Sequence, residues 1–276
     1  MRLGLIQPTA SDTPADNLAA TLAAISQAVE QGAEWVLTPE VTNCVSASRT
    51  RQIEVLELEE HDATLPALQK AAADHGIWLL IGSLAIKTQD PDGRLANRSY
   101  LIDPFGEITA RYDKIHMFDV DVSATETYRE SEGYRPGAQA TLAQTPWGAV
   151  GMTICYDVRF PHLYRGLAQA GATFLTVPSA FSSVTGAAHW HALLRARAIE
   201  TGCFVIAPAQ TGTHPTTRGR ARETYGHSLV VTPWGDVALD AGEASGVYLC
   251  DIDPQDAAQA RARVPSVIKD APFTGP

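Results

Sequence analysis

The sequence predicts an α/β protein in which mixed β-sheets carry helices on their outer faces. Short apolar runs typical of buried strands alternate with amphipathic stretches at helical spacing. A polar–proline–aromatic–glycine pattern occurs three times, at 103–106, 145–148 and 232–235, each time between two β-rich runs. Because proline and glycine at these positions favour a type I turn, each copy predicts a hairpin and hence antiparallel pairs in the sheets. No linker or shift in composition divides residues 1–276, which we interpret as one domain.

Composition limits the partners and the redox environment. The 276 residues are 45% hydrophobic and carry a formal charge of −10, which argues against nucleic acid or an anionic membrane as the main partner. The four cysteines are widely spaced and form no CxxC pair, unlike a zinc site or a disulfide framework. The N-terminus has no signal-peptide core before Pro8, and no apolar run approaches the ~20 residues of a membrane span. We therefore expect a cytoplasmic protein with reduced thiols.

The first half of the chain alternates strands with helices. Apolar runs predict the strands, and apolar residues that recur on one face, often closed by glycine, predict the helices. The expected strands are 2–7, 34–38, 77–87, 94–102 and 107–111, and the expected helices are 14–31, 50–60 and 65–75. Residues 112–137 are polar and rich in acids and tyrosines, and a loop of this length inside a compact domain is usually functional.

The second half repeats the alternation and ends in several strands. The expected strands are 150–154, 173–178, 203–209, 229–232, 237–239 and 246–252. Helices are expected from an N-cap at Asp157 to a stop at Gly171, over 187–201 and over 254–263. Residues 211–225 are rich in glycine, threonine and arginine and are interpreted as a mobile loop, and the tail from Val264 as irregular.

Cys155 lies on the sharp turn between the strand 150–154 and the helix that Asp157 is expected to cap. Free backbone N–H groups and the positive end of a helix dipole at such a turn favour a thiolate. The backbone N–H of Tyr156 is then placed to donate to an oxyanion, as in other nucleophile elbows. The alternative is a buried cysteine that packs as a small hydrophobic residue.

Two more reactive side chains follow strands. Glu40 comes after the strand 34–38 and Lys114 after the strand 107–111, and open α/β sheets place their sites beyond the carboxyl ends of strands. Together with Cys155 they suit cleavage of a C–N bond. The glutamate would move the thiol proton, the cysteine would form a thioester and the lysine would stabilise the oxyanion. Taken singly, the alternative is that both charged residues are solvated surface groups.

Five segments resemble the nitrilase, or carbon–nitrogen hydrolase, superfamily, and they cover essentially the whole chain. They are T-P-E around Glu40, R-Y-D-K-I-H-M-F-D around Lys114, T-I-C-Y-D-V-R-F-P around Cys155, A-H-W-H-A-L-L-R-A-R-A-I-E-T-G at 188–202 and Y-G-H-S-L-V-V-T-P-W-G at 225–235. The resemblance implies an α-β-β-α four-layer sandwich, a Glu-Lys-Cys triad, and a homodimer with the tail at about 264–276 in its interface.

Within the superfamily the sequence most resembles the Nit branch, which includes the amidases of deaminated glutathione and the ω-amidases. The segment F-D-V-D-V-S-A-T-E-T-Y-R-E-S at 118–131 carries the branch's additional glutamate, Glu130. In the family this glutamate helps to position the substrate and the catalytic lysine. Substrate contacts are expected from Ser179, Phe181, Thr185, His189 and Trp190.

We expect a cysteine-dependent amidase that hydrolyses a small anionic ω-amide, with deaminated glutathione as the first candidate. The alternatives are an ω-amidase acting on α-ketoglutaramate, a broader aliphatic amidase and a nitrilase. A catalytically silent binding protein is the alternative from another class, and the intact set Glu40, Lys114, Glu130 and Cys155 argues against it.

A substrate carboxylate requires a fixed cation, and arginine suits it because its planar fork binds a carboxylate in two places. Arg159 is the first candidate because it lies four residues beyond Cys155. The second candidate is the set of loop arginines Arg218, Arg220 and Arg222. The alternative for Arg159 is a structural ion pair or a place in the dimer interface.

The histidines predict neither a metal site nor a Cys–His pair. His116, His189, His191 and His227 are not clustered with ligand spacing, and two helical residues at i and i+2 face apart. The segment around Cys155 lacks the papain-type signature. We therefore expect neither a metal nor a cofactor.

Overall fold

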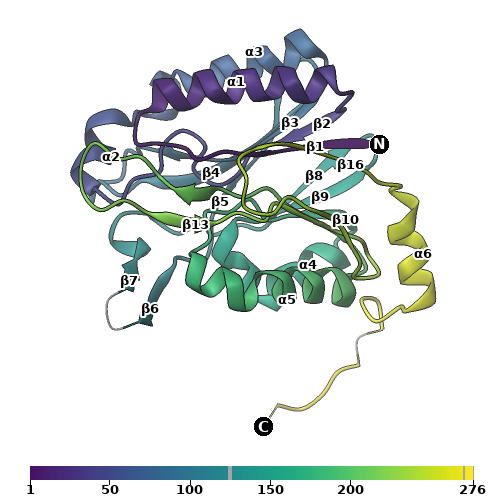
Figure 1. Cartoon of the computed structure of the whole chain (residues 1–276). Helices are drawn as coiled ribbons and strands as arrows, with labels where there is room; N and C mark the ends of the chain where they lie inside the picture. The colour runs from purple at the N-terminus through teal and green to yellow at the C-terminus, as the bar shows by residue number, and fades with distance from the viewer. Residues whose placement is uncertain (124–125, 270, 276) are drawn as a thin grey trace.

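Two six-stranded sheets stack face to face between layers of helices (Figure 1). The computed structural model describes residues 1–123, 126–269 and 271–275. Helices α1 (Pro14–Glu30) and α3 (Thr64–His75) cover the outer face of the first sheet. Helices α4 (Pro161–Gln169) and α5 (Ser183–Thr201) cover the outer face of the second sheet. The expected α-β-β-α arrangement is thus confirmed.

The two sheets have related topologies. The first has the order β16-β1-β2-β3-β4-β5, in which β1, β2 and β3 are parallel and the other three strands are antiparallel to their neighbours. The second has the order β15-β14-β11-β10-β9-β8, in which β9, β10 and β11 are parallel and the remainder are antiparallel.

The bounds of the strands follow the expected ranges closely. In the first sheet they are β1 (Arg2–Gln7), β2 (Trp35–Leu37), β3 (Trp78–Ile86), β4 (Ala96–Ile102), β5 (Ile108–Asp113) and β16 (Gly246–Asp251). In the second sheet they are β8 (Thr141–Thr145), β9 (Gly148–Met152), β10 (Ala172–Thr176), β11 (Phe204–Ala207), β14 (Leu229–Val231) and β15 (Val237–Asp240). The three predicted hairpins are confirmed, because β4 pairs with β5, β8 with β9 and β14 with β15.

The alternation of side chains along the strands builds two hydrophobic layers. Leu5 and Trp35 face the core between the sheets, where Phe174 packs edge-on against Trp35 at 5.6 Å between ring centroids. Val36, which follows Trp35 in the sequence, points to the opposite face of the sheet and packs in the hydrophobic layer that contains Ile25 of α1. Burying each side chain of this size stabilises the fold by about 1.5–3 kcal/mol.

Two segments expected to be loops contain hairpins instead. Residues 112–137 include β6 (Asp119–Ser123), β7 (Glu126–Arg129) and a 3₁₀ turn (Glu130–Glu132). Residues 211–225 include β12 (Thr211–Thr213), which pairs with β13 (Glu223–Tyr225). Both hairpins are short and polar, so they lack the apolar alternation that marks a half-buried strand.

Two helix predictions need correction. The segment 50–60 is not one helix: α2 (Arg49–Val55) ends before the fully buried Leu56, and a separate 3₁₀ turn (Glu59–His61) follows. Asp157 does not cap α4, because it lies inside a 3₁₀ turn (Cys155–Arg159), and α4 begins at Pro161 after Phe160. The Asp157 side chain instead accepts hydrogen bonds from other segments, as described below.

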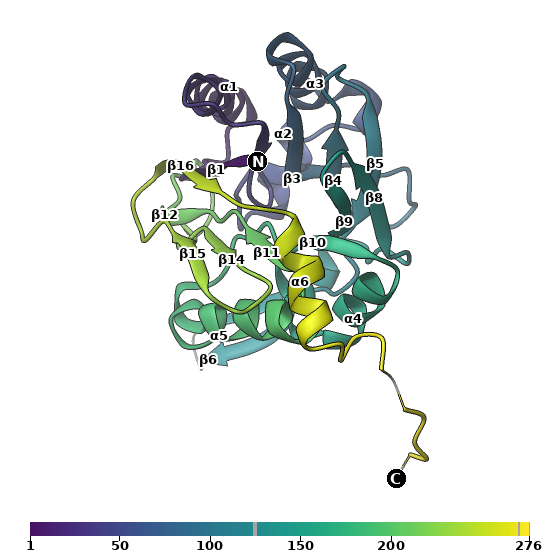
Figure 2. The ribbon, with the colours of Figure 1, turned by 90° about the vertical axis from the view of Figure 1, so that its right-hand side faces the viewer.

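The C-terminal part returns the chain to the second sheet. Helix α6 (Gln255–Arg263) lies on the side of the sandwich shown in Figure 2. The tail first packs on α4 through the buried Val267, whose carbonyl accepts from Gln169 Nε2 at 3.2 Å, and then leaves the body. Arg261 donates hydrogen bonds to the backbone carbonyls of Thr201 at 3.1 Å and Ala172 at 2.5 Å, which ties α6 to α5 and β10. No helix in the described part of the chain is long and apolar enough to cross a bilayer.

Candidate active site

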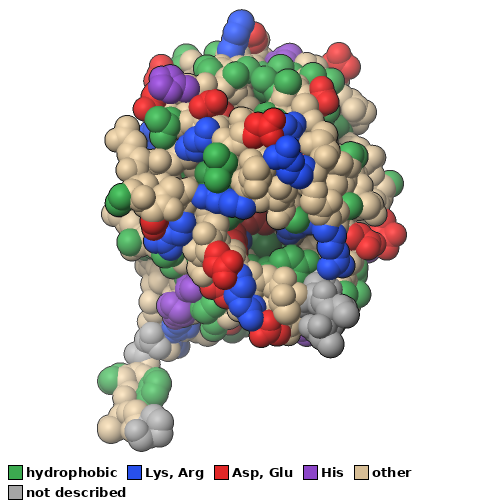
Figure 3. Space-filling view, turned by 90° about the vertical axis from the view of Figure 1, so that its left-hand side faces the viewer, with side chains coloured by type: hydrophobic (Ala, Val, Ile, Leu, Met, Phe, Trp, Pro, Cys, Tyr) green, Lys and Arg blue, Asp and Glu red, His purple; other side chains and the backbone are tan. Residues whose placement is uncertain are grey.

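A cavity of about 700 Å³ opens at the end of the sandwich where α2 and the two small hairpins lie (Figure 1). Glu40, Lys114, Glu130 and Cys155, which are far apart in the sequence, all line it. Figure 3 shows this end of the molecule, where lysine and arginine side chains surround a hollow with acidic atoms inside. This geometry confirms the expectation that the reactive residues beyond the strand ends lie close together.

Lys114 lies between two carboxylates at the buried floor of the cavity. Its Nζ donates to Glu40 Oε1 at 2.8 Å and to both oxygens of Glu130 at 2.9 Å. Burial alone would lower the pKa of Lys114, but the charges of Glu130 and Glu40 outweigh it and raise this pKa well above its ordinary value. Lys114 therefore stays charged across the physiological pH range.

Glu40 is held by three donors. Its Oε1 also accepts from Asn97 Nδ2 at 2.8 Å, and its Oε2 accepts from the Ala180 backbone N–H at 2.8 Å. Burial would raise the pKa of Glu40, yet the Lys114 charge and these hydrogen bonds outweigh it, and the pKa is lowered. The carboxylate is thus ionised and fixed, with a backbone bend at Val41, whose φ is +48°, directly after it.

Cys155 occupies a strained turn, with φ at +47° and its N–H donating to the Pro178 carbonyl at 3.0 Å. A non-glycine residue in the left-handed region is rare and marks a backbone held by its surroundings. The expectation of a resting thiolate is wrong, because burial and then the Glu40 carboxylate raise the pKa of the Cys155 thiol. A neutral thiol next to an ionised carboxylate requires proton transfer before attack.

A buried network that the sequence analysis missed joins the turn of Cys155 to the segment of Lys114. Asp157 Oδ2 accepts from Tyr112 Oη at 2.7 Å and from the Ile154 N–H at 2.9 Å. Its Oδ1 accepts from the His116 N–H at 3.0 Å and lies 2.6 Å from His116 Nδ1. The strand–turn pattern could suggest only a cap for Asp157, because the side-chain partners come from a segment more than 40 positions earlier.

The predicted substrate residues divide into two groups. Phe181 and Thr185 line the cavity, as does Tyr156, whose backbone N–H was expected to serve as oxyanion donor. Ser179, His189, Trp190 and Arg159 lie outside the lining. Ser179 Oγ donates to the Val177 carbonyl at 2.9 Å, and Trp190 Nε1 donates to the His227 carbonyl at 2.8 Å, so both side chains support the walls.

Arg159 packs beneath the cavity wall. Its guanidinium lies 5.9 Å from the Tyr156 ring centroid and 5.5 Å from that of Phe181, and its Nη2 lies 3.3 Å from His189 Nδ1. Stacking on two lining rings gives Arg159 a supporting place. Arg159, the first candidate for a carboxylate contact, is thus not among the residues that line the cavity.

Four arginines line the cavity: Arg49, Arg129, Arg220 and Arg222. Arg218 does not, and forms an ion pair with Glu54 at 3.7 Å. Arg222 Nη2 donates to the Ala180 carbonyl at 3.2 Å, beside the N–H that binds Glu40. Among the described residues that line the cavity, Arg49 Nη1, Asn97 Oδ1, Thr185 Oγ1 and Arg222 Nε are buried without a hydrogen-bond partner. The sequence offered no signal for Arg49, which lay next to a predicted surface helix.

Outside the cavity, the structure brings together two histidines that the sequence analysis left apart. His191 and His227 meet at Asp240, which the sequence analysis did not consider. Within the part of the chain that the structure describes, this is the one group of three or more residues whose ligand atoms are close enough to hold a metal ion. It contributes nothing to the lining of the cavity.

Comparison with known proteins connects this geometry to a family. Residues 2–262 match the family model described as carbon–nitrogen hydrolase. The deaminated glutathione amidase of Yersinia enterocolitica is 40% identical over 237 residues, 85% of this chain and 80% of the relative. The crystal structure of the Caenorhabditis elegans NitFhit protein has a TM-score of 0.89 at 34% identity and covers 98% of this chain, which spans 64% of that longer protein.

A third similar protein is the amidase of Nesterenkonia sp. AN1, with a TM-score of 0.77 at 28% identity over 96% of this chain and 95% of that one. This structure, of a mutant of that amidase, shows the acetamide moiety of fluoroacetamide added covalently at the active-site cysteine. The resemblance found in the sequence is thereby confirmed. The chain belongs to the carbon–nitrogen hydrolase family, with neighbours in the Nit branch of the nitrilase superfamily, and is a hydrolase of C–N bonds other than peptide bonds.

Proposed function

We propose that this enzyme is an amidase that hydrolyses a small ω-amide bearing carboxylate groups, through a thioester on Cys155. The observation that carries the proposal is the buried arrangement in which Lys114 bridges Glu40 and Glu130 beside the Cys155 thiol. One fixed carboxylate, one fixed ammonium and one neutral thiol provide a base, an electrostatic stabiliser and a nucleophile in the same cavity.

The reaction begins with attack of Cys155 Sγ on the amide carbonyl carbon while Glu40 takes the thiol proton. The tetrahedral oxyanion is stabilised by the Lys114 ammonium and the Tyr156 backbone N–H. The C–N bond then breaks as Glu40 returns the proton to the leaving amine, which leaves a thioester. Glu40 next takes a proton from water, the resulting hydroxide attacks the thioester, and the thiol is regenerated with release of the acid.

Glu130 acts as a positioning residue in this scheme. Both of its oxygens accept from Lys114 Nζ at 2.9 Å, and Oε2 also accepts from the Phe118 N–H at 2.6 Å. These contacts restrict the ammonium to the side of the cavity where the oxyanion forms. They also leave Glu40 with one lysine hydrogen bond on one oxygen only.

The charge on the cavity wall supports an anionic substrate. Arg49 and Arg222 each present a buried donor nitrogen that has no partner among the described residues, and Arg220 lines the same wall. An unpaired buried donor is costly, and a carboxylate is the group that a guanidinium binds best. Deaminated glutathione is our first substrate, supported by the name and 40% identity of the Yersinia relative, and α-ketoglutaramate is the alternative.

The test is release of the amine or acid product across a panel of deaminated glutathione, α-ketoglutaramate, simple ω-amides and nitriles. We expect carboxylate-bearing amides to be hydrolysed fastest, with no effect of chelators. Turnover of nitriles together with none of the keto-amides would overturn the substrate class. Inactivation by chelators, together with turnover retained in Cys155→Ala, would replace the cysteine mechanism with a metal-dependent one.

Matched arginine variants test the carboxylate contact. We expect Arg222→Met to lower kcat/KM for an acidic amide by about 2–5 kcal/mol in transition-state free energy, with little effect on a neutral analogue. Arg220→Met, at a second arginine of the same cavity wall, is tested in the same way. Arg159→Met is the control, because loss of its stacking on Tyr156 and Phe181 should affect both substrates equally. Equal losses in Arg222→Met would show that the carboxylate binds elsewhere.

The remaining expectations concern assembly and location. We infer a cytoplasmic homodimer of one carbon–nitrogen hydrolase domain, with the tail from Val264 in the interface. Val264, Ile268 and Phe273 expose 52%, 79% and 88% of their surface, which supports burial of this tail against another chain. Residues 270 and 276 of the tail lie outside the described residues. Truncation after Val267, which keeps that buried residue in the core, should shift the sedimentation of the protein from dimer to monomer.

A further inference from the structure

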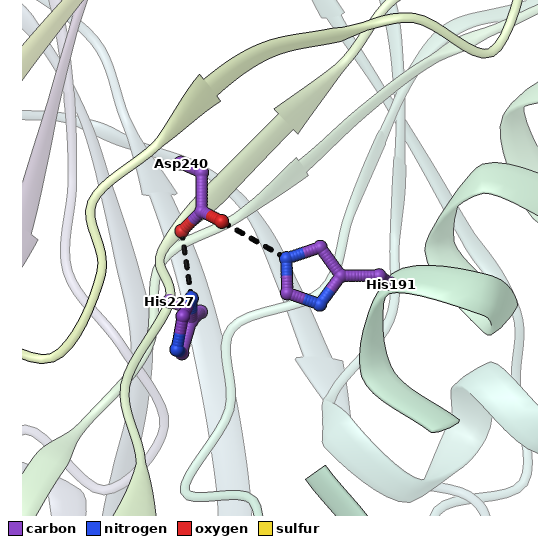
Figure 4. Close-up of side chains that lie close together, drawn as sticks. All are labelled: His191, His227 and Asp240. Carbon is purple, nitrogen blue, oxygen red and sulfur yellow. Dashed lines mark hydrogen bonds and ion pairs between the residues drawn. The ribbon is translucent and has the colours of Figure 1, made fainter. Parts of the chain in front are cut away.

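Three residues from separate elements converge at the surface near α5. His191 lies on α5, His227 lies just before β14, and Asp240 is the last residue of β15 (Figure 4). Asp240 Oδ1 lies 2.8 Å from His227 Nδ1, and Asp240 Oδ2 lies 3.0 Å from His191 Nε2. One ligand atom from each residue lies within 4.8 Å of the other two.

We propose that His191, His227 and Asp240 form a binding site for one divalent transition-metal ion of the zinc type. Two imidazoles and one carboxylate are a ligand set that Zn²⁺ takes readily. In a tetrahedral zinc site with bonds of ~2.0–2.1 Å, ligand atoms are about 3.3 Å apart. The two contacts to Asp240, at 2.8 and 3.0 Å, are slightly shorter than that value, and all three ligand atoms lie within 4.8 Å of one another, so small side-chain movements would close the site.

Binding requires that each histidine present a lone pair to the ion. A ring nitrogen of each lies at hydrogen-bond distance from Asp240, His191 Nε2 at 3.0 Å and His227 Nδ1 at 2.8 Å. When the ion binds, these two nitrogens give their lone pairs to the metal and any hydrogen is carried on the other ring nitrogen. The contacts to Asp240 are then replaced by metal bonds.

Neighbouring contacts hold the ligands in place. Tyr225 stacks on the His227 ring at 4.4 Å between centroids and at an interplanar angle of 23°. The Gly242 N–H donates to Asp240 Oδ1 at 2.9 Å, and His227 keeps a positive φ of 54° while its N–H donates to the Gly242 carbonyl. Such outer contacts orient ligands before the ion arrives.

Charge and access favour a cation. The chain carries a formal charge of −10, which favours a cation over an anion at its surface. The side chains of His191, Asp240 and His227 are 36%, 34% and 19% exposed, so water can complete the coordination. The site is separate from Cys155. It is connected to the cavity through β13, which begins directly after the cavity-lining Arg222 and ends at Tyr225. A bound ion would therefore stiffen the β12–β13 hairpin.

The experiment uses the untagged full chain after dialysis against a chelator. Titration calorimetry with Zn²⁺ should show one ion per chain with micromolar affinity and a raised Tm. Co²⁺ should give the visible absorption of a four- or five-coordinate site. His191→Ala and Asp240→Asn should weaken Zn²⁺ binding by at least about tenfold and remove the Co²⁺ spectrum.

Further variants keep the result interpretable. His191→Gln removes the imidazole ligand but preserves a hydrogen-bond donor toward Asp240. It therefore tests metal ligation even if His191→Ala fails to fold. His61→Ala, which removes an exposed histidine on the 3₁₀ turn before α3, is the control and should bind as the wild type does. The proposal is overturned if the wild type takes up no zinc, or if His191→Gln and Asp240→Asn retain the wild-type affinity.

Discussion

Two clusters of ionisable side chains can be compared in this molecule. Glu40, Lys114 and Glu130 meet at the floor of the cavity, where their side chains are 6%, 2% and 14% exposed. The other cluster, His191, His227 and Asp240, is 19–36% exposed at the surface. Each is assembled from three separate elements, and each has a non-glycine residue at positive φ in or beside it, Cys155 at +47° and His227 at +54°.

The difference between the clusters lies in what can replace a lost partner. The side chains of the buried cluster have little access to water, so each ion depends on the others to compensate its charge. In the surface cluster water or a metal ion can take the place of a hydrogen-bond partner at small cost. Burial thus separates an arrangement suited to catalysis from one suited to exchange of ligands.

The largest expected effect is on the proposed nucleophile of the buried cluster. Cys155→Ser should lower kcat by roughly 10⁴-fold or more while the circular dichroism spectrum stays native, because no other group there forms the thioester. Mass spectrometry of enzyme trapped with substrate should locate the acyl group on Cys155, and Cys250→Ala is the control with full turnover. An adduct on Cys44, which also lines the cavity, would assign the chemistry to a different thiol.

The next effect concerns the proposed base. Glu40→Gln should lower kcat by about 10²–10⁴-fold with substrate affinity retained, because an amide cannot accept the thiol proton. Since the pKa of Glu40 is lowered, wild-type kcat should persist at mildly acidic pH and fall only below the ordinary glutamate value of 4.5. Single-turnover rates of thioester formation give the measurement. Near-normal kcat in Glu40→Gln would transfer the role of base to Glu130.

The third effect compares the stability of the two clusters directly. Lys114→Met leaves two buried carboxylates without their counter-ion and should lower the free energy of unfolding by about 3–5 kcal/mol. Asp240→Asn, at the half-exposed cluster, should cost no more than about 1 kcal/mol in the absence of metal. Urea denaturation measures both changes. Adding Glu130→Gln to Lys114→Met should restore part of the loss, and equal costs in the two clusters would contradict the comparison.

The parts of the site that the sequence predicts are those tied to strand ends. Glu40, Lys114 and Cys155 each follow a strand whose apolar pattern is plain, and the carboxyl ends of the strands place them together. The family resemblance added Glu130. The prediction of a resting thiolate failed because a helix end was considered without the burial that raises the pKa of the Cys155 thiol.

The parts that sequence reasoning missed depend on contacts between distant polar segments. The hairpins β6–β7 and β12–β13 have no apolar face, since the buried residues of β12–β13 are the threonines Thr211 and Thr224, so both were interpreted as loops. Asp157, Arg49 and Asp240 obtain their surroundings from residues distant in the chain. Position along the sequence is informative where a residue follows a regular strand, and uninformative where its partners come from irregular polar segments.

The last and smallest effect extends the comparison to a buried histidine with neutral partners. His214 is 1% exposed, and its two ring nitrogens lie 2.7 Å from the Ala10 carbonyl and from Thr224 Oγ1. Burial lowers the pKa of His214 from 6.5 to about 4, against the hydrogen bond to Ala10 and with help from the Arg222 charge. The unfolded chain therefore binds more protons than the folded one between these values, and stability falls as the pH falls from 6.5 toward about 4.

At pH 5 this difference should remove about 2 kcal/mol from the free energy of unfolding relative to pH 7. His214→Gln retains a hydrogen-bond donor and an acceptor but does not titrate. The stability that this variant loses between pH 7 and pH 5 should therefore be smaller than the wild-type loss by about 2 kcal/mol. Other titrating groups are common to both proteins and cancel in the comparison. Identical pH dependence in wild type and His214→Gln would mean that His214 ionises inside the folded protein.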